Sequence, residues 1–214
     1  MDLVGGGRLG RLEVILVRAA VSEETTAPGW RAERGSDAEV DRPLSEEGRR
    51  QAEELADELE PYHLSAVYSS PSRRAKETVE PTARRRGLAV QLLPDLRERV
   101  LSPTPLAGGE RHAEIERSFG DEDYEPAGGE TGRVAQRRGA AILDLLRSRH
   151  AVGARLLVAS HGNLIALILK TLEPAVGYSF WEQMPTPAIY HLEHDGIGWR
   201  VMGGHGFVRI GDLD

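Results

Sequence analysis

Short apolar runs alternate along the chain with longer stretches in which apolar residues recur three or four positions apart. The short runs lack glycine and proline, as is typical of strands buried on both faces of a sheet. They lie at residues 12–17, 65–69, 89–93 and 155–160. The periodic stretches predict helices at residues 45–60, 70–86, 131–149 and 162–172. Repeated strand and helix units predict an α/β fold in which helices cover both faces of a mostly parallel sheet.

The ends and faces of these helices are also predicted from residue types. Ser45 is a predicted N-cap, and Ser70 is a predicted N-cap followed by Pro71 as the first helical residue. In the helix at 131–149, a set of apolar residues is expected to face the core: Val134, Ala141, Ile142, Leu145 and Leu146. Residues 188–192 and 198–202 predict a closing hairpin around Asp195 and Gly196.

Two segments carry no sustained hydrophobic period. Residues 22–42 are polar and predict a long loop. Residues 94–127 are rich in proline, glycine and acidic residues, with a weak helical pattern at 113–119, and predict an insertion over one edge of the fold. The length fits a single domain over residues 1–214. Because long loops in compact domains often carry function, we expect substrate specificity to lie in these two segments.

Polar residues follow the carboxyl ends of the predicted strands, where ligands bind in parallel α/β sheets. They are Arg18 after the first strand, Ser69 and Ser70 with Arg74 after the second, Glu98 after the third, and Ser160 and His161 after the fourth, with Gly162 directly following. Two guanidinium groups supply forked donors for phosphate oxygens, and the imidazole adds another donor. A helix that starts at Gly162 points free backbone amides toward the same place. The sequence therefore predicts a pocket for a phosphoryl group.

Five short motifs occur in a fixed order along the chain. They are Val17-Arg18-Ala19-Ala20, Leu44-Ser45-Glu46-Glu47-Gly48 with Gln51-Ala52, Ser69-Ser70-Pro71 with Arg74-Ala75 and Thr78, Gly129-Glu130-Thr131, and Ser160-His161-Gly162. As an ordered set they resemble the motifs of the histidine phosphatase superfamily, which has the phosphoglycerate-mutase-like fold. The resemblance spans roughly residues 12–165. It implies a three-layer α/β/α sandwich.

The resemblance also implies the chemistry of the site. In the family, a histidine after the first arginine attacks phosphorus and becomes phosphohistidine, while a carboxylic acid protonates the leaving group. Carried over to this chain, Arg18, Arg74 and His161 hold the phosphoryl group, and Glu98 is the candidate acid. Ala19 stands at the position of the nucleophile, and its methyl group has no lone pair. The chain as written is therefore expected to be inactive or nearly so.

Three hypotheses about function follow. The leading one is a phosphomonoesterase for a small phosphorylated metabolite, disabled at Ala19 by an engineered exchange of histidine for alanine. The second is a natural pseudophosphatase that binds phosphorylated ligands without turnover. The third is a phosphoglycerate-type mutase. The tryptophan and asparagine that follow this motif in the mutase branch are absent after Ala20, which argues against the third hypothesis.

Composition limits the partners. The formal net charge of −7 argues against nucleic-acid binding, so the Arg137 and Arg138 pair is interpreted as a solvated helix face. Any anion site must be local, and phosphate or sulfate is expected to occupy it. The apolar runs are too short to cross a bilayer and no signal-peptide pattern is present, so we expect a cytoplasmic protein without a membrane partner. The absence of cysteine and the scattered histidines predict neither a metal nor a cofactor, and the oligomeric state is not indicated.

Overall fold

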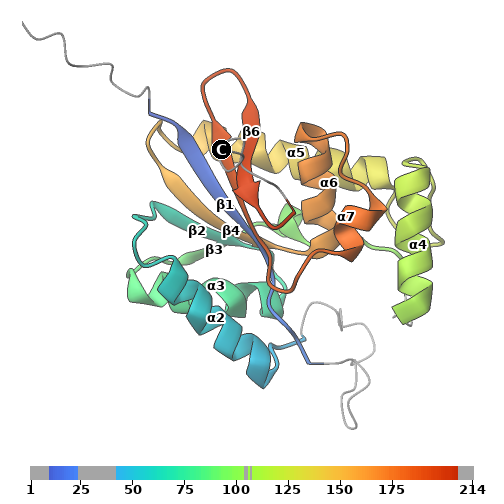
Figure 1. Cartoon of the computed structure of the whole chain (residues 1–214), viewed down its shortest axis with the longest axis horizontal. Helices are drawn as coiled ribbons and strands as arrows, with labels where there is room; N and C mark the ends of the chain where they lie inside the picture. Colours follow the sequence, from blue (N-terminus) through green and yellow to red (C-terminus); the bar gives the residue numbers. More distant parts are fainter. Residues whose placement is uncertain (1–9, 24–41, 104–105, 107, 207–214) are drawn as a thin grey trace, which may run out of the picture.

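The computed structural model describes residues 10–23, 42–103, 106 and 108–206, and within them six strands form one sheet. The strands are β1 (Leu12–Arg18), β2 (Ala66–Ser69), β3 (Val90–Leu92), β4 (Arg155–Ser160), β5 (Ile189–His194) and β6 (Trp199–Gly204). They lie in the order β3-β2-β4-β1-β5-β6 (Figure 1). The four strands from β3 to β1 pair in parallel, and β5 pairs antiparallel with both β1 and β6. The predicted mostly parallel sheet and its closing hairpin are both confirmed.

Helices cover both faces of the sheet and complete the three predicted layers (Figure 1). The helices are α2 (Glu46–Glu58), α3 (Arg73–Arg85), α4 (Gly108–Gly120), α5 (Gly132–Arg149), α6 (Gly162–Leu172) and α7 (Tyr178–Glu182), with a 3-10 turn η1 (Pro94–Leu96). Helices α2 and α3 pack on one face, and α5 and α6 pack on the other. The predicted insertion at 94–127 contains η1 and α4, and residues 24–41 of the predicted long loop lie outside the described residues.

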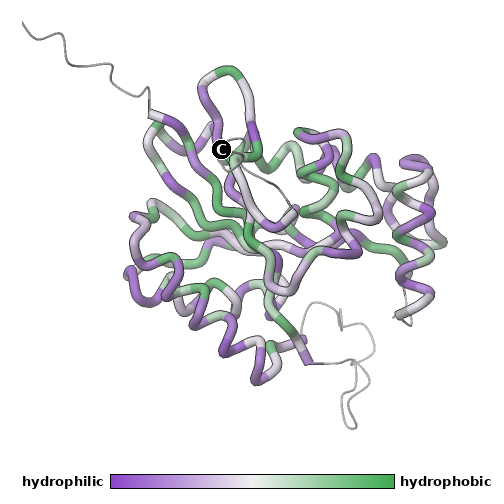
Figure 2. The backbone as a smooth tube through the Cα atoms, viewed as in Figure 1, coloured by the Kyte–Doolittle hydropathy of each residue, from purple (hydrophilic) through white to green (hydrophobic). Residues whose placement is uncertain are grey.

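Strand β1 lies between β4 and β5 and is buried on both faces, which explains its continuous apolar sequence. Val14 and Leu16 belong to the apolar cluster beneath α5 and α6, whereas Ile15 and Val17 belong to the cluster beneath α2 and α3. Burial of one such side chain stabilises the fold by roughly 1.5–3 kcal/mol. Figure 2 shows the hydrophobic residues concentrated along the central strands. The core therefore fixes the end of β1 in the middle of the sheet, where Arg18 lies.

The turn between β2 and α3 differs from the prediction. Helix α3 begins at Arg73 with Ser72 as its N-cap residue, later than the predicted start at Ser70 and Pro71. The reason is that the Ser70 hydroxyl contacts His161 Nε2 at 2.8 Å and accepts a hydrogen bond from Ser72 N at 3.2 Å. Ser70 therefore belongs to a turn that faces the candidate site and does not cap the helix.

Helix α5 presents a partly different face to the core than predicted. Ile142 is buried as expected, but Val134 and Ala141 are exposed. The reason is the contact with α6 at Gly139, where an added methyl group would lie only 2.5 Å from Ile168 Cγ1. Two helices that approach this closely pack through the side that carries the glycine. This contact sets the rotation of α5 and turns Val134 and Ala141 outward.

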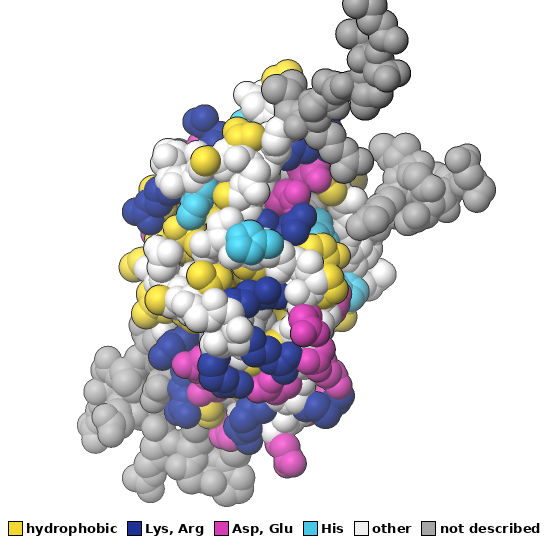
Figure 3. Space-filling view, turned by 90° about the vertical axis from the view of Figure 1, so that its left-hand side faces the viewer, with side chains coloured by type: hydrophobic (Ala, Val, Ile, Leu, Met, Phe, Trp, Pro, Cys, Tyr) yellow, Lys and Arg dark blue, Asp and Glu magenta, His cyan; other side chains and the backbone are white. Residues whose placement is uncertain are grey.

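Ion pairs link α2 and α3 on the outer surface of the molecule. Glu53 accepts hydrogen bonds from Arg84 at 3.0 Å and from Arg85 at 2.7 Å. On the side shown in Figure 3, basic and acidic side chains are interspersed over the lower half of the surface. Exposed pairs of this kind contribute roughly 0–1 kcal/mol each. In the part of the chain that the structure describes, no helix has the length and apolar content needed to cross a bilayer.

Candidate active site

Arg18 ends β1 at the carboxyl edge of the parallel strands. Its Nη1 donates to the carbonyl oxygens of Met184 and Pro185, the latter at 3.3 Å. Gly162, at the start of α6, permits a close approach, because a methyl group there would lie 3.1 Å from Arg18 Nε. Burial lowers the pKa of Arg18 from its usual value, and the charge of Glu98 opposes this shift. Since a guanidinium stays protonated in proteins, Arg18 is a fixed, half-buried cation.

Arg74 and His161 meet in the same region, as predicted. Arg74 lies in the first turn of α3 and His161 is the N-cap residue of α6; they are 7% and 3% exposed. Arg74 Nη2 donates to His161 Nδ1 at 3.1 Å. Because arginine has no acceptor, Nδ1 carries the lone pair, and the proton is on Nε2, which donates to Ser70 Oγ at 2.8 Å.

His161 is a neutral ring in this environment. Burial, followed by the charge of Arg74 and of other nearby arginines, holds the pKa of His161 well below its usual value. Nδ1 binds Arg74 and Nε2 binds Ser70 in this structure, and the ring also lines the candidate cavity. Direct donation from the ring to a bound phosphate stays a prediction. In this structure His161 orients the Arg74 guanidinium.

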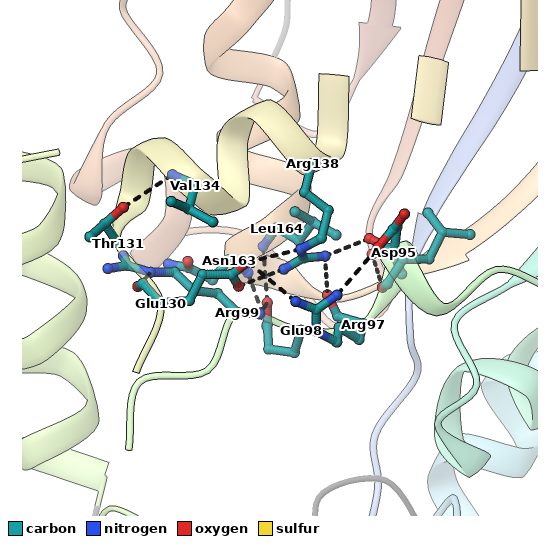
Figure 4. Close-up of polar contacts among 12 residues, drawn as sticks. Asp95, Arg97, Glu98, Arg99, Glu130, Thr131, Val134, Arg138, Asn163 and Leu164 are labelled. Atoms are coloured by element: carbon teal, nitrogen blue, oxygen red, sulfur yellow. Dashed lines mark hydrogen bonds and ion pairs between the residues drawn. The ribbon is translucent and has the colours of Figure 1, made fainter. Parts of the chain in front are cut away.

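Glu98 lies in the loop after η1 and binds the first turn of α6 (Figure 4). Its Oε2 accepts a hydrogen bond from Asn163 N at 3.1 Å. Its Oε1 accepts from Leu164 N at 3.0 Å and from Arg99 N at 2.9 Å. The predicted free amides of α6 are therefore partly taken by this carboxylate, which caps the helix. A carboxylate has about four lone-pair sites, three of which are used here, so the remaining site for a proton is on Oε2.

Thr78 joins the loop after β1 to helix α3. Its Oγ1 accepts a hydrogen bond from Ala20 N at 2.9 Å and donates to Arg74 O at 2.7 Å. Ala19 is held by its own backbone, which donates to Ser160 O at 2.9 Å. These bonds hold Ala19 in the wall of the cavity that Arg18 and Arg74 also line, and they account for the threonine in the motif.

The predicted site residues line a single cavity of about 280 Å³. They are Arg18, Ala19, Arg74, Glu98, His161 and Gly162. Arg42, Arg111 and Thr186 also line this cavity and were not predicted. Arg42 and Arg111 are two of the 27 basic residues of the chain, and they lie in the two segments with the weakest sequence pattern. Their position in segments expected to carry specificity is the one signal that points to them.

The cavity attracts anions although the whole chain is acidic. Among the described residues that line it, four arginines are accompanied by one carboxylate, that of Glu98. Such a concentration of guanidinium groups in a hollow raises the local potential and suits a phosphate group. Within the described residues, no group of three or more histidine, cysteine or acidic side chains is arranged to hold a metal ion.

Comparison with known proteins agrees with this geometry. The family model of the histidine phosphatase superfamily (branch 1) matches residues 14–203, so the chain belongs to this superfamily. Phosphoglycerate mutase-like protein 4 of Arabidopsis thaliana is 31% identical over 173 residues, which cover 76% of this chain and 72% of that protein. The probable phosphoglycerate mutase GpmB of Escherichia fergusonii is 26% identical over 205 residues, or 90% and 89% of the two chains.

Solved structures of phosphatases share the fold. A mycobacterial glucosyl-3-phosphoglycerate phosphatase in complex with VO3 has a TM-score of 0.69 at 25% identity, covering 88% of this chain and 96% of its own. A phosphoserine phosphatase of Entamoeba histolytica, in which a histidine was changed to alanine, is in complex with phosphoserine. It has a TM-score of 0.70 at 20% identity and covers 91% of this chain and 97% of its own. The phosphoglycerate-mutase-like α/β fold predicted from the motifs is thus confirmed.

Proposed function

We propose that the cavity binds the phosphoryl group of a small phosphate ester and that the chain, with Ala19, holds this ester without forming phosphohistidine. The observation that carries the proposal is the shared cavity of Arg18, Arg74, Ala19 and Glu98. Guanidinium groups make two parallel hydrogen bonds to a phosphate, which orients the ester and balances its charge. The Ala19 methyl group has no electron pair with which to attack phosphorus.

The same scaffold becomes a phosphomonoesterase when a histidine stands at position 19. The ring nitrogen attacks phosphorus, and the bond from phosphorus to the ester oxygen breaks. A proton on Glu98 Oε2 passes to the leaving oxygen, and the resulting carboxylate then takes a proton from the water that releases phosphate. Arg18 and Arg74 stabilise the charge that develops on the phosphoryl oxygens.

The similar phosphoserine phosphatase in which a histidine was changed to alanine supports this picture, because it is in complex with phosphoserine. Ala19 has two possible origins under our proposal. An engineered exchange is the one we favour, since the other predicted groups all line the same cavity, and a natural pseudophosphatase is the other. Both origins give the same expectation for the chain as written, namely binding without turnover.

The names of the sequence relatives support a second candidate, a phosphoglycerate-type mutase. A mutase returns the phosphoryl group to a second hydroxyl and releases little free phosphate. A binding module without catalytic competence is the third candidate. It would stay inert even with a histidine at position 19.

The Ala19→His variant separates these candidates. We expect it to release free phosphate from an aryl phosphate and to form an acid-labile phosphoenzyme in single-turnover labelling. The matched control is Ala19→Gln, which adds a polar side chain of similar size without a nucleophilic ring. The parent chain and the Gln variant are expected to bind inorganic phosphate in calorimetric titration and to hydrolyse nothing.

Each outcome identifies one candidate. Transfer to a second hydroxyl without free phosphate supports the mutase, and phosphate binding without turnover supports the binding module. A parent chain that fails to bind inorganic phosphate at all would contradict the proposed function.

A further inference from the structure

A buried ion pair lies behind the cavity wall that carries Glu98. The side chains of Arg138 and Glu130 are 8% and 9% exposed. Arg138 Nε donates to Glu130 Oε1 at 3.0 Å and its Nη2 donates to Glu130 Oε2 at 2.7 Å, so the two groups meet in a fork (Figure 4). The sequence predicted a solvated helix face for the Arg137 and Arg138 pair. That prediction is wrong for Arg138, which points from α5 toward the loop after η1.

The third nitrogen of Arg138 binds the backbone of the loop that carries Glu98. Its Nη1 donates to the carbonyl oxygens of Asp95 and Arg97, the latter at 3.0 Å. Two of the three residues that precede Glu98 are therefore held by one guanidinium group. Since Arg138 is in turn fixed by Glu130, the loop is tied to helix α5.

Glu130 holds the other side of the same loop. Its backbone carbonyl accepts from Arg99 Nε at 2.7 Å, and its backbone amide donates to Val100 O at 2.7 Å. Gly129 permits this approach, because a methyl group there would lie 2.8 Å from Val100 O. The glycine and the glutamate of the Gly129-Glu130-Thr131 motif thus share one task, which is to bring the start of α5 against the residues after Glu98.

We infer that Arg138 and Glu130 are positioning residues that hold the Glu98 carboxylate at the first turn of α6 and at the edge of the cavity. The loop from Asp95 to Val100 has no regular structure beyond η1, so its conformation depends on these contacts. Transfer of two charges from water to the protein interior costs free energy, so a buried ion pair contributes little net stability to the fold. Arg138 contacts the backbone before Glu98, and Glu130 contacts the residues after it. We therefore attribute the pair to fixing one conformation of the loop that carries the candidate acid.

The position of Glu98 can be followed without catalysis, in the chain as it exists. Glu98 protects the amides of Asn163 and Leu164, so their hydrogen exchange measured by NMR reports where the carboxylate lies. We expect Arg138→Met to accelerate exchange of both amides about tenfold, the factor expected for one lost hydrogen bond. Glu98→Ala should give the same or a larger acceleration, and amides in the second half of α6 should be unaffected.

The matched control is Arg137→Met, which removes an exposed arginine from the same helix and should leave both amides unchanged. Arg138→Lys should accelerate the exchange of both amides as Arg138→Met does. The reason is that one ammonium group cannot bind the carboxylate as a fork and also reach two carbonyls. If Arg138→Met destabilises the fold, Glu130→Gln provides a milder change with the same expected direction. Unchanged protection of the two amides in folded variants of Arg138 and Glu130 would overturn the inference.

The consequence for chemistry rests on the proposed function and is measured in the Ala19→His background. An acid matters for a poor leaving group and much less for a good one. Arg138→Met should therefore lower kcat for an alkyl phosphate about tenfold more than for a nitrophenyl phosphate, and Glu98→Gln should show the same pattern. Equal losses on both substrates would contradict a role through Glu98. Failure of Ala19→His to turn over either substrate would contradict the phosphomonoesterase part of the proposed function, and the exchange measurement would still decide the positioning role.

Discussion

Arg74 has two roles in the cavity. It contributes a buried cation, and it donates to His161 Nδ1. We expect Arg74→Met to raise the dissociation constant of inorganic phosphate about 10- to 100-fold, because hydrogen bonds to charged groups contribute about 1.5–3 kcal/mol. Calorimetric titration of the Ala19 chain with phosphate measures this effect directly.

The neighbouring residue supplies the control for this prediction. Arg73 lies on the same helix, is 52% exposed and pairs with Glu77 at 2.7 Å. Arg73→Met should change phosphate affinity by less than about twofold, since an exposed pair contributes roughly 0–1 kcal/mol. Equal affinities for the Arg73 and Arg74 variants would place the anion elsewhere.

The neutral state of His161 makes stability depend on pH. In the unfolded chain this residue takes up a proton near its usual pKa, about 6.5, whereas in the folded chain the lowered pKa keeps it neutral at lower pH. Below about pH 6.5 the unfolded state therefore binds more protons, and the free energy of unfolding falls as the pH falls. Between about pH 7.5 and 5.5 this loss should be about 1 kcal/mol larger in the parent chain than in His161→Gln.

Urea unfolding of both proteins at the two pH values tests this expectation. Glutamine is a suitable replacement because its amide oxygen accepts from Arg74 without titrating. Parallel pH profiles for the two proteins would show that His161 is already free to take up a proton in the folded state.

At the scale of elements, the start of α6 depends on the small size of Gly162. An added methyl group would lie 3.1 Å from Arg18 Nε and 3.4 Å from Trp181 Nε1, and Arg18 is held from its other side by backbone carbonyls. Gly162→Ala should therefore displace Arg18 and weaken phosphate binding about 3- to 10-fold, or roughly 1 kcal/mol. Phosphate titration together with thermal unfolding separates this local effect from loss of the fold.

Gly109→Ala is the matched exchange in another helix. Gly109 lies in α4, and a methyl group there meets no atom within 4 Å. This variant should bind phosphate normally and gain up to about 1 kcal/mol, because alanine favours the helix more than glycine does. A Gly162 variant that binds phosphate as well as the Gly109 variant would contradict the role assigned to the close contact.

Strands and helices could be predicted from the sequence where a single effect, such as the burial of apolar side chains, determines the local structure. Leu12–Arg18 and Arg155–Ser160 are strands because burial on both faces demands continuous apolar sequence. The start of α3 could not be predicted, because Ser70 is attracted to His161 from a distant part of the chain. The prediction of which α5 residues face the core was partly wrong for the same reason, since the rotation of α5 is set by the contact of Gly139 with α6.

At the scale of the molecule, the convergence of the predicted site residues followed from topology alone. Parallel strands end at one edge, so residues after different strands gather there. Topology did not predict the presence of Arg42 and Arg111 in the cavity wall, nor the burial of Arg138. Nothing in the local sequence distinguishes a buried arginine from an exposed one, because the difference is created by partners such as Glu130 that lie elsewhere in the chain.

The order of the strands has a consequence for folding during synthesis. Strand β1 is made early, yet its two neighbours in the sheet are β4 and β5, and the cavity wall extends as far along the chain as Thr186. A growing polypeptide on the ribosome therefore carries Arg18 for most of its synthesis without the partners that shape the pocket. The ability to hold an anion arises late, and its presence marks a chain that has been completed through β5.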